Sequence, residues 1–343
     1  MLAATAPTLS MLGAASAKLS MTNVVSTGSV TSATSLSSKE WLTQQPAGAY
    51  TTARTCAGGR RLFEWDTHVE RTAASAAAML GDPTGVTAPA ASALPALLAA
   101  LGRPEALRRR LDAAVSAAVC EYSASNGQPA GELKVTVLVT WPPAAARGEC
   151  SAAAAERGEV AAHVAPLPPL PSAPVRVEVR GAPRANAAAK DSSWVVDRAP
   201  LEALMRPDFN EFLLATESGL LMEGSQTNFY AVHGGAVHTA GDGVLAGTVR
   251  RLLLEVCERE GIPLVLEPPS LASVAEWEGA LVSSTSRLLL PIDELYRPVE
   301  GAPSADADLL RRFDNADGSL AARLRDLVRG EVEAHSSEIV NGA

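Results

Sequence analysis

Alternating hydrophobic and polar residues predict that the N-terminal half of the chain combines strands with helices. A Gly-Gly turn at 58–59 joins the first two expected strands into a hairpin. Apolar residues at helical spacing predict one helix after this hairpin, up to residue 80, and another over 104–120. The strands expected in this half are 50–55, 61–63, 133–141 and 160–166.

The C-terminal half shows a second mixture of strands and helices. A helix is expected over 249–260, because Leu252, Leu253 and Val256 form an apolar stripe and Gly261 ends it. A last amphipathic helix is expected over 320–334. The strands expected here are 175–179, 211–216, 220–232, 236–239 and 280–283. The pattern as a whole predicts an α/β fold class, in the broad sense that includes α+β, with two domains.

The composition of particular segments indicates where these domains begin and end. We expect an N-terminal α/β domain over 40–166, a stiff proline-rich linker over 167–174 and a C-terminal domain over 175–343. Residues 1–39 are rich in Ser, Thr and Ala and contain no acidic residue. They are therefore expected to be a disordered tail or a transit peptide, although the arginine enrichment of a transit peptide is missing. A transit peptide would direct the protein to the plastid, and without one we expect a cytoplasmic protein.

Charge and cysteine usage exclude several classes of function. The net charge of −9 gives no general attraction to nucleic acid or to an anionic membrane. No apolar run approaches the ~20 residues of a membrane-spanning helix. The four cysteines form no CxxC pair, and the five histidines lack metal-ligand spacing, so no metal is expected.

Lysine is rare, which makes candidates for amine chemistry easy to survey. The lysines are Lys18, Lys39, Lys134 and Lys190. Schiff-base chemistry needs a primary amine, which the guanidinium group of arginine cannot supply. Lys134 is a rival to Lys190, but it lies in an alternating strand, where a solvated lysine is expected.

Three segments of the C-terminal half carry residues suited to a cofactor site. The strand at 222–230 holds a carboxylate, Glu223, followed by small polar residues that include Asn228. A glycine-containing turn at 245–250 opens a helix, whose free N–H groups suit a phosphate. Hydroxyl groups end the strand at 283–286. Taken alone, these segments could be a hairpin edge, an ordinary helix start and a capped turn.

Their order along the chain resembles the class IV aminotransferases. In that family a lysine is followed by a Glu-Gly-Ser-x-x-Asn-aromatic strand, a Leu-x-Gly-x-x-Arg helix start and a Ser-x-Thr-x turn. Here Lys190 precedes 223–229, 245–250 and 283–286 in the same order. The resemblance covers about 48–291 and implies the two-domain fold of branched-chain and D-amino-acid aminotransferases, known as fold type IV. It also implies pyridoxal 5'-phosphate between the domains, and a homodimer.

The resemblance assigns a role to each matching residue. Lys190 is expected to bind the cofactor as a Schiff base and to transfer a proton. Glu223 is expected to pair with the pyridine nitrogen. Arg71, in a His-x-x-Arg helix, is expected to bind the phosphate. The other expected cofactor contacts are Asn228, Gly247, Thr248, Val249, Thr285 and Ser286.

The substrate pocket is expected on one face of the first strand. Tyr50, Thr52 and Arg54 share this face through the two-residue period of a strand, and in the family it lines the pocket. Ala161 replaces the arginine of an Arg-x-His pair in D-amino-acid aminotransferases, which disfavours strict D specificity. His163, the histidine of that pair, either faces the pocket or is structural.

Three functions follow from these residues. The first is an aminotransferase that moves an amino group between an amino acid and a 2-oxo acid. The second is a lyase, because 51–54 closely resembles the corresponding strand of aminodeoxychorismate lyases, which eliminate pyruvate and in which the threonine matching Thr52 assists proton transfer. The third is a catalytically silent relative, which would be expected to lack the lysine, the glutamate or the phosphate turn.

Overall fold

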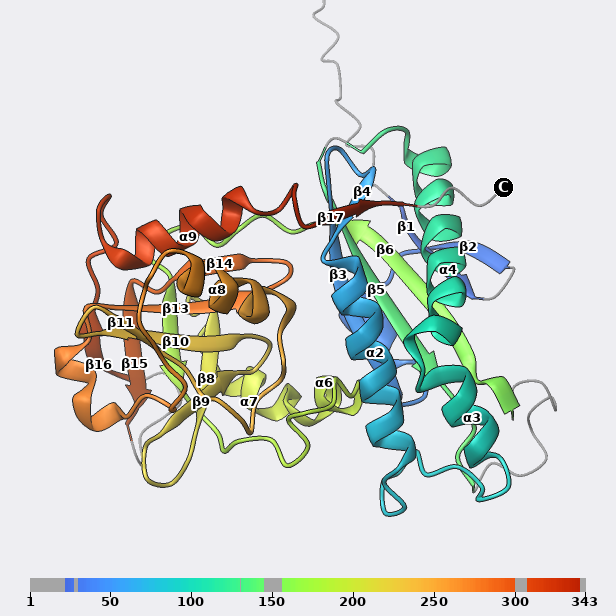
Figure 1. Cartoon of the computed structure of the whole chain (residues 1–343), viewed down its shortest axis with the longest axis horizontal. Helices are drawn as coiled ribbons and strands as arrows, with labels where there is room; N and C mark the ends of the chain where they lie inside the picture. Colours follow the sequence, from blue (N-terminus) through green and yellow to red (C-terminus); the bar gives the residue numbers. More distant parts are fainter. Residues whose placement is uncertain (1–21, 28–29, 130, 145–155, 300–306, 340–343) are drawn as a thin grey trace, which may run out of the picture.

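The computed structural model describes residues 22–27, 30–129, 131–144, 156–299 and 307–339. These residues form two lobes, each built around a β-sheet (Figure 1). Within them, no helix combines the length and the apolar character needed to cross a membrane.

The N-terminal lobe contains an antiparallel sheet in the order β17-β4-β3-β5-β6-β1-β2. The hairpin predicted around Gly58-Gly59 is confirmed as β3 and β4. Val135 and Val137 of β5 are fully buried, because this face of the sheet packs into the lobe's main hydrophobic core. The strands are β1 (Asn23–Thr27), β2 (Val30–Thr34), β3 (Ala49–Cys56), β4 (Arg61–Phe63), β5 (Leu133–Thr140), β6 (Glu159–Pro166) and β17 (Ser336–Glu338).

Helices cover both faces of this sheet. α2 (Trp65–Leu80), α3 (Leu94–Leu101) and α4 (Pro104–Asn126) supply the residues of the main core, and Figure 1 shows α2 and α4 lying across the sheet. The short α1 (Ser38–Thr43) packs with Tyr50 and Leu138, whose side chains project from the opposite face. Ser37 begins α1 with a capping box, in which its hydroxyl and the Glu40 carboxylate bond each other's backbone N–H groups.

The C-terminal lobe contains a mixed sheet in the order β12-β11-β10-β9-β8-β7-β15-β16, and β13 pairs with β10 and β14. One strand predicted at 220–232 is corrected to two, because the Gly224 N–H donates to the Thr227 carbonyl at 2.7 Å and the chain turns there. The strands are β7 (Arg176–Val179), β8 (Glu211–Ala215), β9 (Leu221–Gly224), β10 (Asn228–His233), β11 (Ala236–His238), β12 (Leu264–Val265), β13 (Gly279–Ser284), β14 (Leu288–Pro291), β15 (Glu294–Pro298) and β16 (Ala307–Arg312).

Two amphipathic helices cover the sheet of the C-terminal lobe. Both predicted helices are confirmed, as α8 (Thr248–Arg259) and α9 (Leu320–Gly330). Leu252 and Leu253 of α8 and Leu324 of α9 share one core with strands β10 and β13. Shorter helices are α6 (Ser193–Asp197), α7 (Ala199–Leu204) and the 3₁₀ helix η1 (Leu271–Glu276).

Both ends of the expected domain division need correction. The tail or transit peptide expected over 1–39 is wrong for the residues after 21, because β1 and β2 belong to the N-terminal sheet and Val24 is fully buried opposite Val164 of β6. Residues 1–21 lie outside the described residues, and the plastid address stays a prediction. At the other end, β17 lies within the range expected for the C-terminal domain, 175–343, but it belongs to the N-terminal sheet, because it pairs with β4.

Candidate active site

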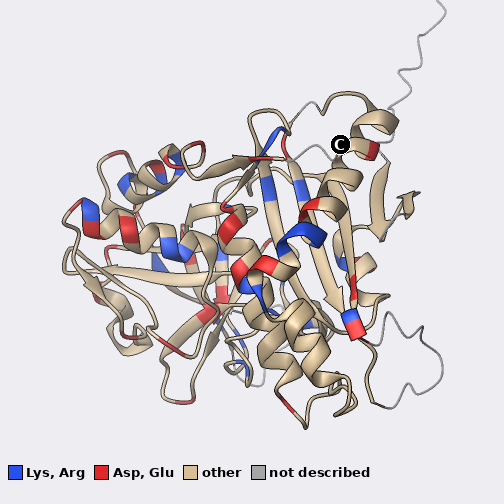
Figure 2. Cartoon of the chain, turned by 45° about the vertical axis from the view of Figure 1, so that its right-hand side comes forward, with Lys and Arg blue, Asp and Glu red and all other residues tan. Residues whose placement is uncertain are grey.

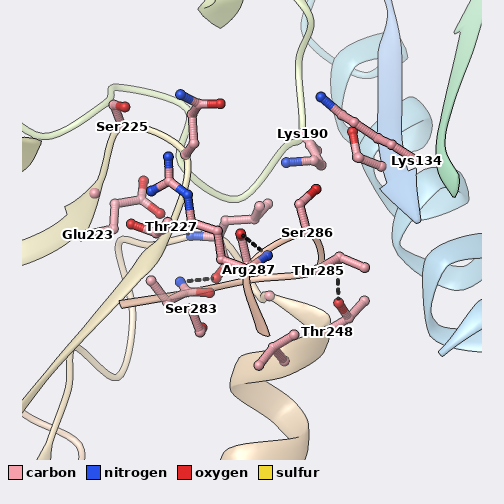
Figure 3. Close-up of a pocket in the computed structure, with 18 of the residues that line it drawn as sticks. Lys134, Lys190, Glu223, Ser225, Thr227, Thr248, Ser283, Thr285, Ser286 and Arg287 are labelled. Atoms are coloured by element: carbon pink, nitrogen blue, oxygen red, sulfur yellow. Dashed lines mark hydrogen bonds between the residues drawn. The ribbon is translucent and has the colours of Figure 1, made fainter. Parts of the chain in front are cut away.

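A cavity of about 320 Å³ opens where the two lobes meet, a size typical of small-molecule sites. Loops and strand ends of both lobes contribute to it, as Figure 3 shows for Lys134 of β5 and for Glu223 and Thr285 of the C-terminal lobe. Most of the residues predicted from the sequence line this cavity: Tyr50, Thr52, Arg71, Lys190, Glu223, Asn228, Gly247, Thr248, Val249, Thr285 and Ser286.

The backbone of Lys190 is hydrogen-bonded to the N-terminal lobe. Its N–H donates to the Ser75 hydroxyl of α2 at 3.0 Å, and its carbonyl accepts from the Tyr50 N–H of β3 at 2.9 Å. Its ammonium lies 4.7 Å from the centre of the Tyr50 ring. Burial lowers the pKa of Lys190 to about 8, and the Arg71 and Arg184 cations act in the same direction. A larger share of this amine is therefore neutral and nucleophilic near neutral pH than for a solvated lysine.

Neighbouring cations also lower the pKa of the Tyr50 phenol. Burial opposes its ionisation, but Lys190 and Arg198 outweigh burial and lower the pKa of Tyr50 to about 8. Arg198, at the start of α7, is itself paired with Glu202 at 2.8 Å. Tyr50 therefore contributes a phenol that can exchange a proton near neutral pH, next to the candidate lysine.

Glu223 lies in the cavity wall and is held from two sides. Arg184 lies 2.7 Å from its Oε1, and the Leu245 N–H donates to its Oε2 at 3.0 Å. Burial raises the pKa of the Glu223 carboxyl, while Arg184 and the Leu245 N–H act to lower it. Sequence reasoning missed Arg184, because one arginine in an irregular segment carries no pattern that marks it as a partner of Glu223.

The His-x-x-Arg helix supplies a neutral histidine and a partly buried arginine. The Arg71 Nη2 donates to the Thr51 hydroxyl at 2.8 Å. The His68 Nδ1 lies 2.7 Å from this hydroxyl and 3.2 Å from the Arg71 Nη2. Burial holds the pKa of His68 well below its usual range, and Arg71 adds to this effect. A neutral His68 accepts through Nδ1 at both contacts, so the Thr51 hydroxyl accepts from Arg71 and donates to His68.

The start of α8 and the turn after β13 form a polar cradle. No side chain caps the N-terminus of α8 at Gly247, so its first N–H groups are available to an anion. The Thr248 and Thr285 hydroxyls lie 3.0 Å apart beside it. The Arg71 Nε is buried and has no hydrogen-bond partner among the described residues. This orphaned donor, the hydroxyl pair and the helix N-terminus fit the phosphate of the expected cofactor.

Gly247 is required by a close approach of the chain to itself. A Cβ atom at this position would lie 2.0 Å from the Asn228 Oδ1. The Asn228 amide in turn donates to the Leu245 carbonyl at 2.8 Å. Asn228 therefore holds the 245–247 turn, which brings the Leu245 N–H to Glu223 and the helix start to the cavity.

The comparison with known proteins decides the family. The family model for amino-transferase class IV matches residues 48–295, more than half of the chain. The chain belongs to this family. None of the curated proteins matches its sequence.

Solved class IV structures share this fold across nearly their whole length. The branched-chain aminotransferase of Thermoproteus uzoniensis, solved with norvaline, is 17% identical and aligns over 93% of this chain and 99% of its own with a TM-score of 0.63. The fold IV-transaminase CpuTA1 of Curtobacterium pusillum is 21% identical over 91% and 99%, with a TM-score of 0.62. A hypothetical aminotransferase of Mycobacterium tuberculosis in a PLP-bound form is 18% identical over 91% and 99%, with a TM-score of 0.60. The fold is fold type IV.

Two residues expected in the substrate pocket do not line the cavity of this class IV aminotransferase. His163 is fully buried, stacks on Trp41 of α1 with ring centroids 5.5 Å apart, and its Nε2 lies 2.9 Å from the Leu36 carbonyl. It is a core residue, because α1 covers this end of the sheet. Arg54 lies further along β3, at the level of Lys134 in β5, and it is not among the residues of the cavity wall.

Lys134, which was expected to be a solvated strand lysine, does line the cavity. The alternation of β5 correctly separates its apolar face from the face that carries Lys134, but that second face does not meet solvent. Leu138 of this face packs with α1, whereas around Lys134 the face meets the other lobe, and Lys134 lines the cavity (Figure 3). A strand face turned to a cavity and one turned to solvent have the same polar pattern, so alternation alone does not identify Lys134 as a cavity residue.

Proposed function

We propose that this chain is a pyridoxal-phosphate-dependent aminotransferase that moves an amino group between an amino acid and a 2-oxo acid, with Lys190 as the Schiff-base lysine. The observation that carries the proposal is the position of Lys190 and Glu223 in one cavity, beside the uncapped N-terminus of α8. The homodimer expected from the family resemblance belongs to the same proposal.

Different residues of the cavity would bind different parts of the cofactor. Arg71, Thr248 and Thr285 with the start of α8 would bind the phosphate. Glu223, held by Arg184, would bind the pyridine nitrogen. When bound, the cofactor supplies an electron sink for the carbanion that forms at the substrate.

The protein's own task in the reaction is to move a proton. The Lys190 Nζ, with a pKa of about 8, can accept a proton from the substrate α-carbon and return it. Tyr50, in contact with Lys190, lies where it can hold the amine in position and stabilise its charged form.

A lyase reaction is the second candidate, and the position of Thr52 favours it. Thr52 lines the cavity together with Lys190. Its hydroxyl can donate or accept a proton at a substrate atom away from the α-carbon, as the elimination of pyruvate would require. This role is the one that the 51–54 resemblance to aminodeoxychorismate lyases implies.

The visible spectrum of the purified protein with pyridoxal phosphate tests the shared part of both functions. We expect a visible absorption band in the wild type that is lost in Lys190→Ala. Bleaching of the band by an amino acid, with turnover only when a 2-oxo acid is added, supports the transferase. Pyruvate release from aminodeoxychorismate without an oxo acid supports the lyase. A wild type without the band, or Lys190→Ala with it, refutes the assignment of Lys190 and favours the catalytically silent relative.

A further inference from the structure

The residues proposed to bind the cofactor phosphate come from both lobes. Arg71 lies on α2, whose buried residue Val69 belongs to the core of the N-terminal lobe. Thr248 lies at the start of α8, and Leu252 of this helix packs in a core of the C-terminal lobe. N–H···O hydrogen bonds form over donor–acceptor distances of about 2.7–3.2 Å. Both halves can therefore bind one phosphate only over a narrow range of separations between the two helices.

The two helices face each other across a gap. A cavity of about 810 Å³ lies between them, and Ala74 of α2 and Leu254 of α8 are among the residues of its wall. Arg71 and Gly247 line both this cavity and the one that contains Lys190, so the two cavities meet at the proposed phosphate site. A contact that bridges α2 and α8 therefore bears directly on the geometry of this site.

Glu64 and Arg251 form such a bridge. Glu64 immediately precedes α2, and its carboxylate pairs with the Arg251 guanidinium of α8. The Glu64 side chain is 2% exposed, so the pair is less screened by salt than a surface ion pair. The Arg251 N–H donates to the Gly247 carbonyl at 3.0 Å, which connects Arg251 to the residue before α8. Figure 2 shows acidic and basic positions close together where the two lobes meet.

The backbone of Glu64 is strained, and several contacts hold it in this conformation. Its φ of 54° lies in the left-handed region, which residues with a side chain seldom adopt. The neighbouring side chains diverge, because Phe63 packs in a core of the C-terminal lobe and Trp65 in that of the N-terminal lobe. The Thr67 hydroxyl donates to the Glu64 Oε2 at 2.6 Å, and the His335 Nδ1 lies 2.8 Å from Oε1. Strain of this kind persists where surrounding contacts over-determine it, and it clusters at functional sites.

Helical periodicity connects this bridge to the phosphate site on both helices. Arg71 follows Glu64 by about two helical turns and therefore lies on the same side of α2. Thr67, between them on this side, lines the 810 Å³ cavity together with Arg71. On α8, Arg251 follows Thr248 by about one turn. A change in the Glu64–Arg251 contact is thus passed on to both halves of the phosphate site.

We propose that the Glu64–Arg251 ion pair positions Arg71 of α2 against the start of α8, and so sets the affinity of the site for a phosphate group. Both are positioning residues, since neither lines the cavity that contains Lys190. This inference rests on the proposed function, because its ligand is the phosphate of the proposed cofactor. The cofactor aldehyde, which would react with Lys190, needs no contact with this pair.

Pyridoxal phosphate and pyridoxal differ only in the phosphate, so the ratio of their Kd values isolates the phosphate site. Both are measured from the visible band for the wild type, Glu64→Gln, Arg251→Met and the double variant. We expect each single variant to bind pyridoxal phosphate about tenfold more weakly, equivalent to one charge-assisted hydrogen bond, and to keep its affinity for pyridoxal. The double variant should lose no more than either single variant, because both remove the same ion pair. Arg251→Lys, which keeps the charge, should retain most of the affinity.

Glu255→Gln is the matched control, because Glu255 is the other carboxylate that pairs with Arg251 but lies on α8 itself. It removes a partner of Arg251 without breaking the bridge to α2, so it should leave the ratio of Kd values unchanged. An equal loss of affinity for both ligands in Glu64→Gln would indicate general loosening of the fold and overturns the proposal. So does an unchanged ratio in Glu64→Gln and Arg251→Met, or an equal change of the ratio in Glu255→Gln. A wild type that binds neither ligand refutes the proposed function, and the positioning role with it.

Discussion

The Arg184 guanidinium lies 2.7 Å from the Glu223 carboxylate, and both side chains are nearly excluded from solvent, with exposed fractions of 9% and 4%. Arg184 also donates to the Ala187 carbonyl at 3.1 Å and lies over the Trp194 ring, 5.6 Å from its centroid. One arginine therefore fixes both the candidate cofactor carboxylate and the turn that leads to Lys190.

Replacing Arg184 should destabilise the protein in a pH-dependent way. Arg184→Met leaves the buried Glu223 carboxylate without its cation, which we expect to cost about 3 kcal/mol of unfolding free energy at pH 8. Arg184 acts to lower the pKa of Glu223, so this pKa rises further in the variant and the folded state binds a proton more tightly than the unfolded state. The loss should therefore shrink as the pH falls toward 5.

Urea unfolding of the apoprotein at pH 5 and pH 8 measures this effect. Arg312→Met is the control, because Arg312 is 70% exposed and its pair with Glu294 should contribute no more than about 1 kcal/mol. If the stability of Arg184→Met changed with pH in the same way as that of the wild type, Arg184 would not control the pKa of Glu223.

Cofactor attachment should follow the titration of Lys190. Its pKa is lowered to about 8, so the amine is increasingly protonated and unreactive below that pH. The rate at which the visible band forms should rise with pH and level off above about 8. Tyr50 acts to raise the pKa of Lys190, so Tyr50→Phe should move this profile to lower pH. Stopped-flow absorbance over pH 6–10, a range of about two units on either side of the midpoint, checks both statements. A rate without pH dependence would show that another step controls attachment.

The hydroxyl pair beside α8 should contribute to cofactor affinity. Thr285→Val removes one hydroxyl without changing the size of the side chain, and we expect the Kd for pyridoxal phosphate to rise about fivefold, from a loss of about 1 kcal/mol. Thr248→Val should act similarly. The loss of binding free energy in the double variant should be smaller than the sum of the two single losses, because the two hydroxyls lie 3.0 Å apart and depend on each other.

A fluorescence titration with the cofactor gives these affinities. Thr239→Val serves as the control, since Thr239 is buried in the same lobe but its hydroxyl donates to the Phe229 carbonyl and does not reach the cavity. Equal losses of affinity in Thr239→Val and Thr285→Val would indicate general destabilisation and not phosphate binding.

Gly247→Ala should disturb the cradle more than any loss of a hydroxyl. The new Cβ would lie 2.0 Å from the Asn228 Oδ1, and relief of that clash moves the turn that holds the start of α8. We expect roughly 1–3 kcal/mol of lost stability and a cofactor affinity reduced at least tenfold. Gly330→Ala, where the new methyl group would meet no atom within 4 Å, should leave cofactor affinity unchanged and should not lower stability, because alanine is favoured over glycine in a helix. Thermal unfolding and cofactor titration of the two variants provide the comparison.

The cofactor side of the cavity could be predicted from the sequence, but most of the substrate side could not. Glu223, Gly247 and Thr285 occur in short segments whose local structure already defines their environment, and their order along the chain marks the family. The surroundings of Lys134 and His163 depend on which element covers a sheet face, which strand alternation alone does not specify. Both residues lie on one face of the N-terminal sheet, which meets the other lobe near Lys134 and is covered by α1, a helix beside the expected tail, near His163.

The pairing of β17 with β4 has a consequence for how the protein is made. The edge of the N-terminal sheet is formed by residues 336–338, and His335 beside them contacts the Glu64 carboxylate at 2.8 Å. Residues 336–338 thus complete a lobe whose other strands emerge from the ribosome much earlier. Until they arrive, β4 is an open strand edge on the nascent chain, where it can pair with other polypeptides. Residues 336–338 therefore close a site of misassembly that stays open from the synthesis of β4 until their own.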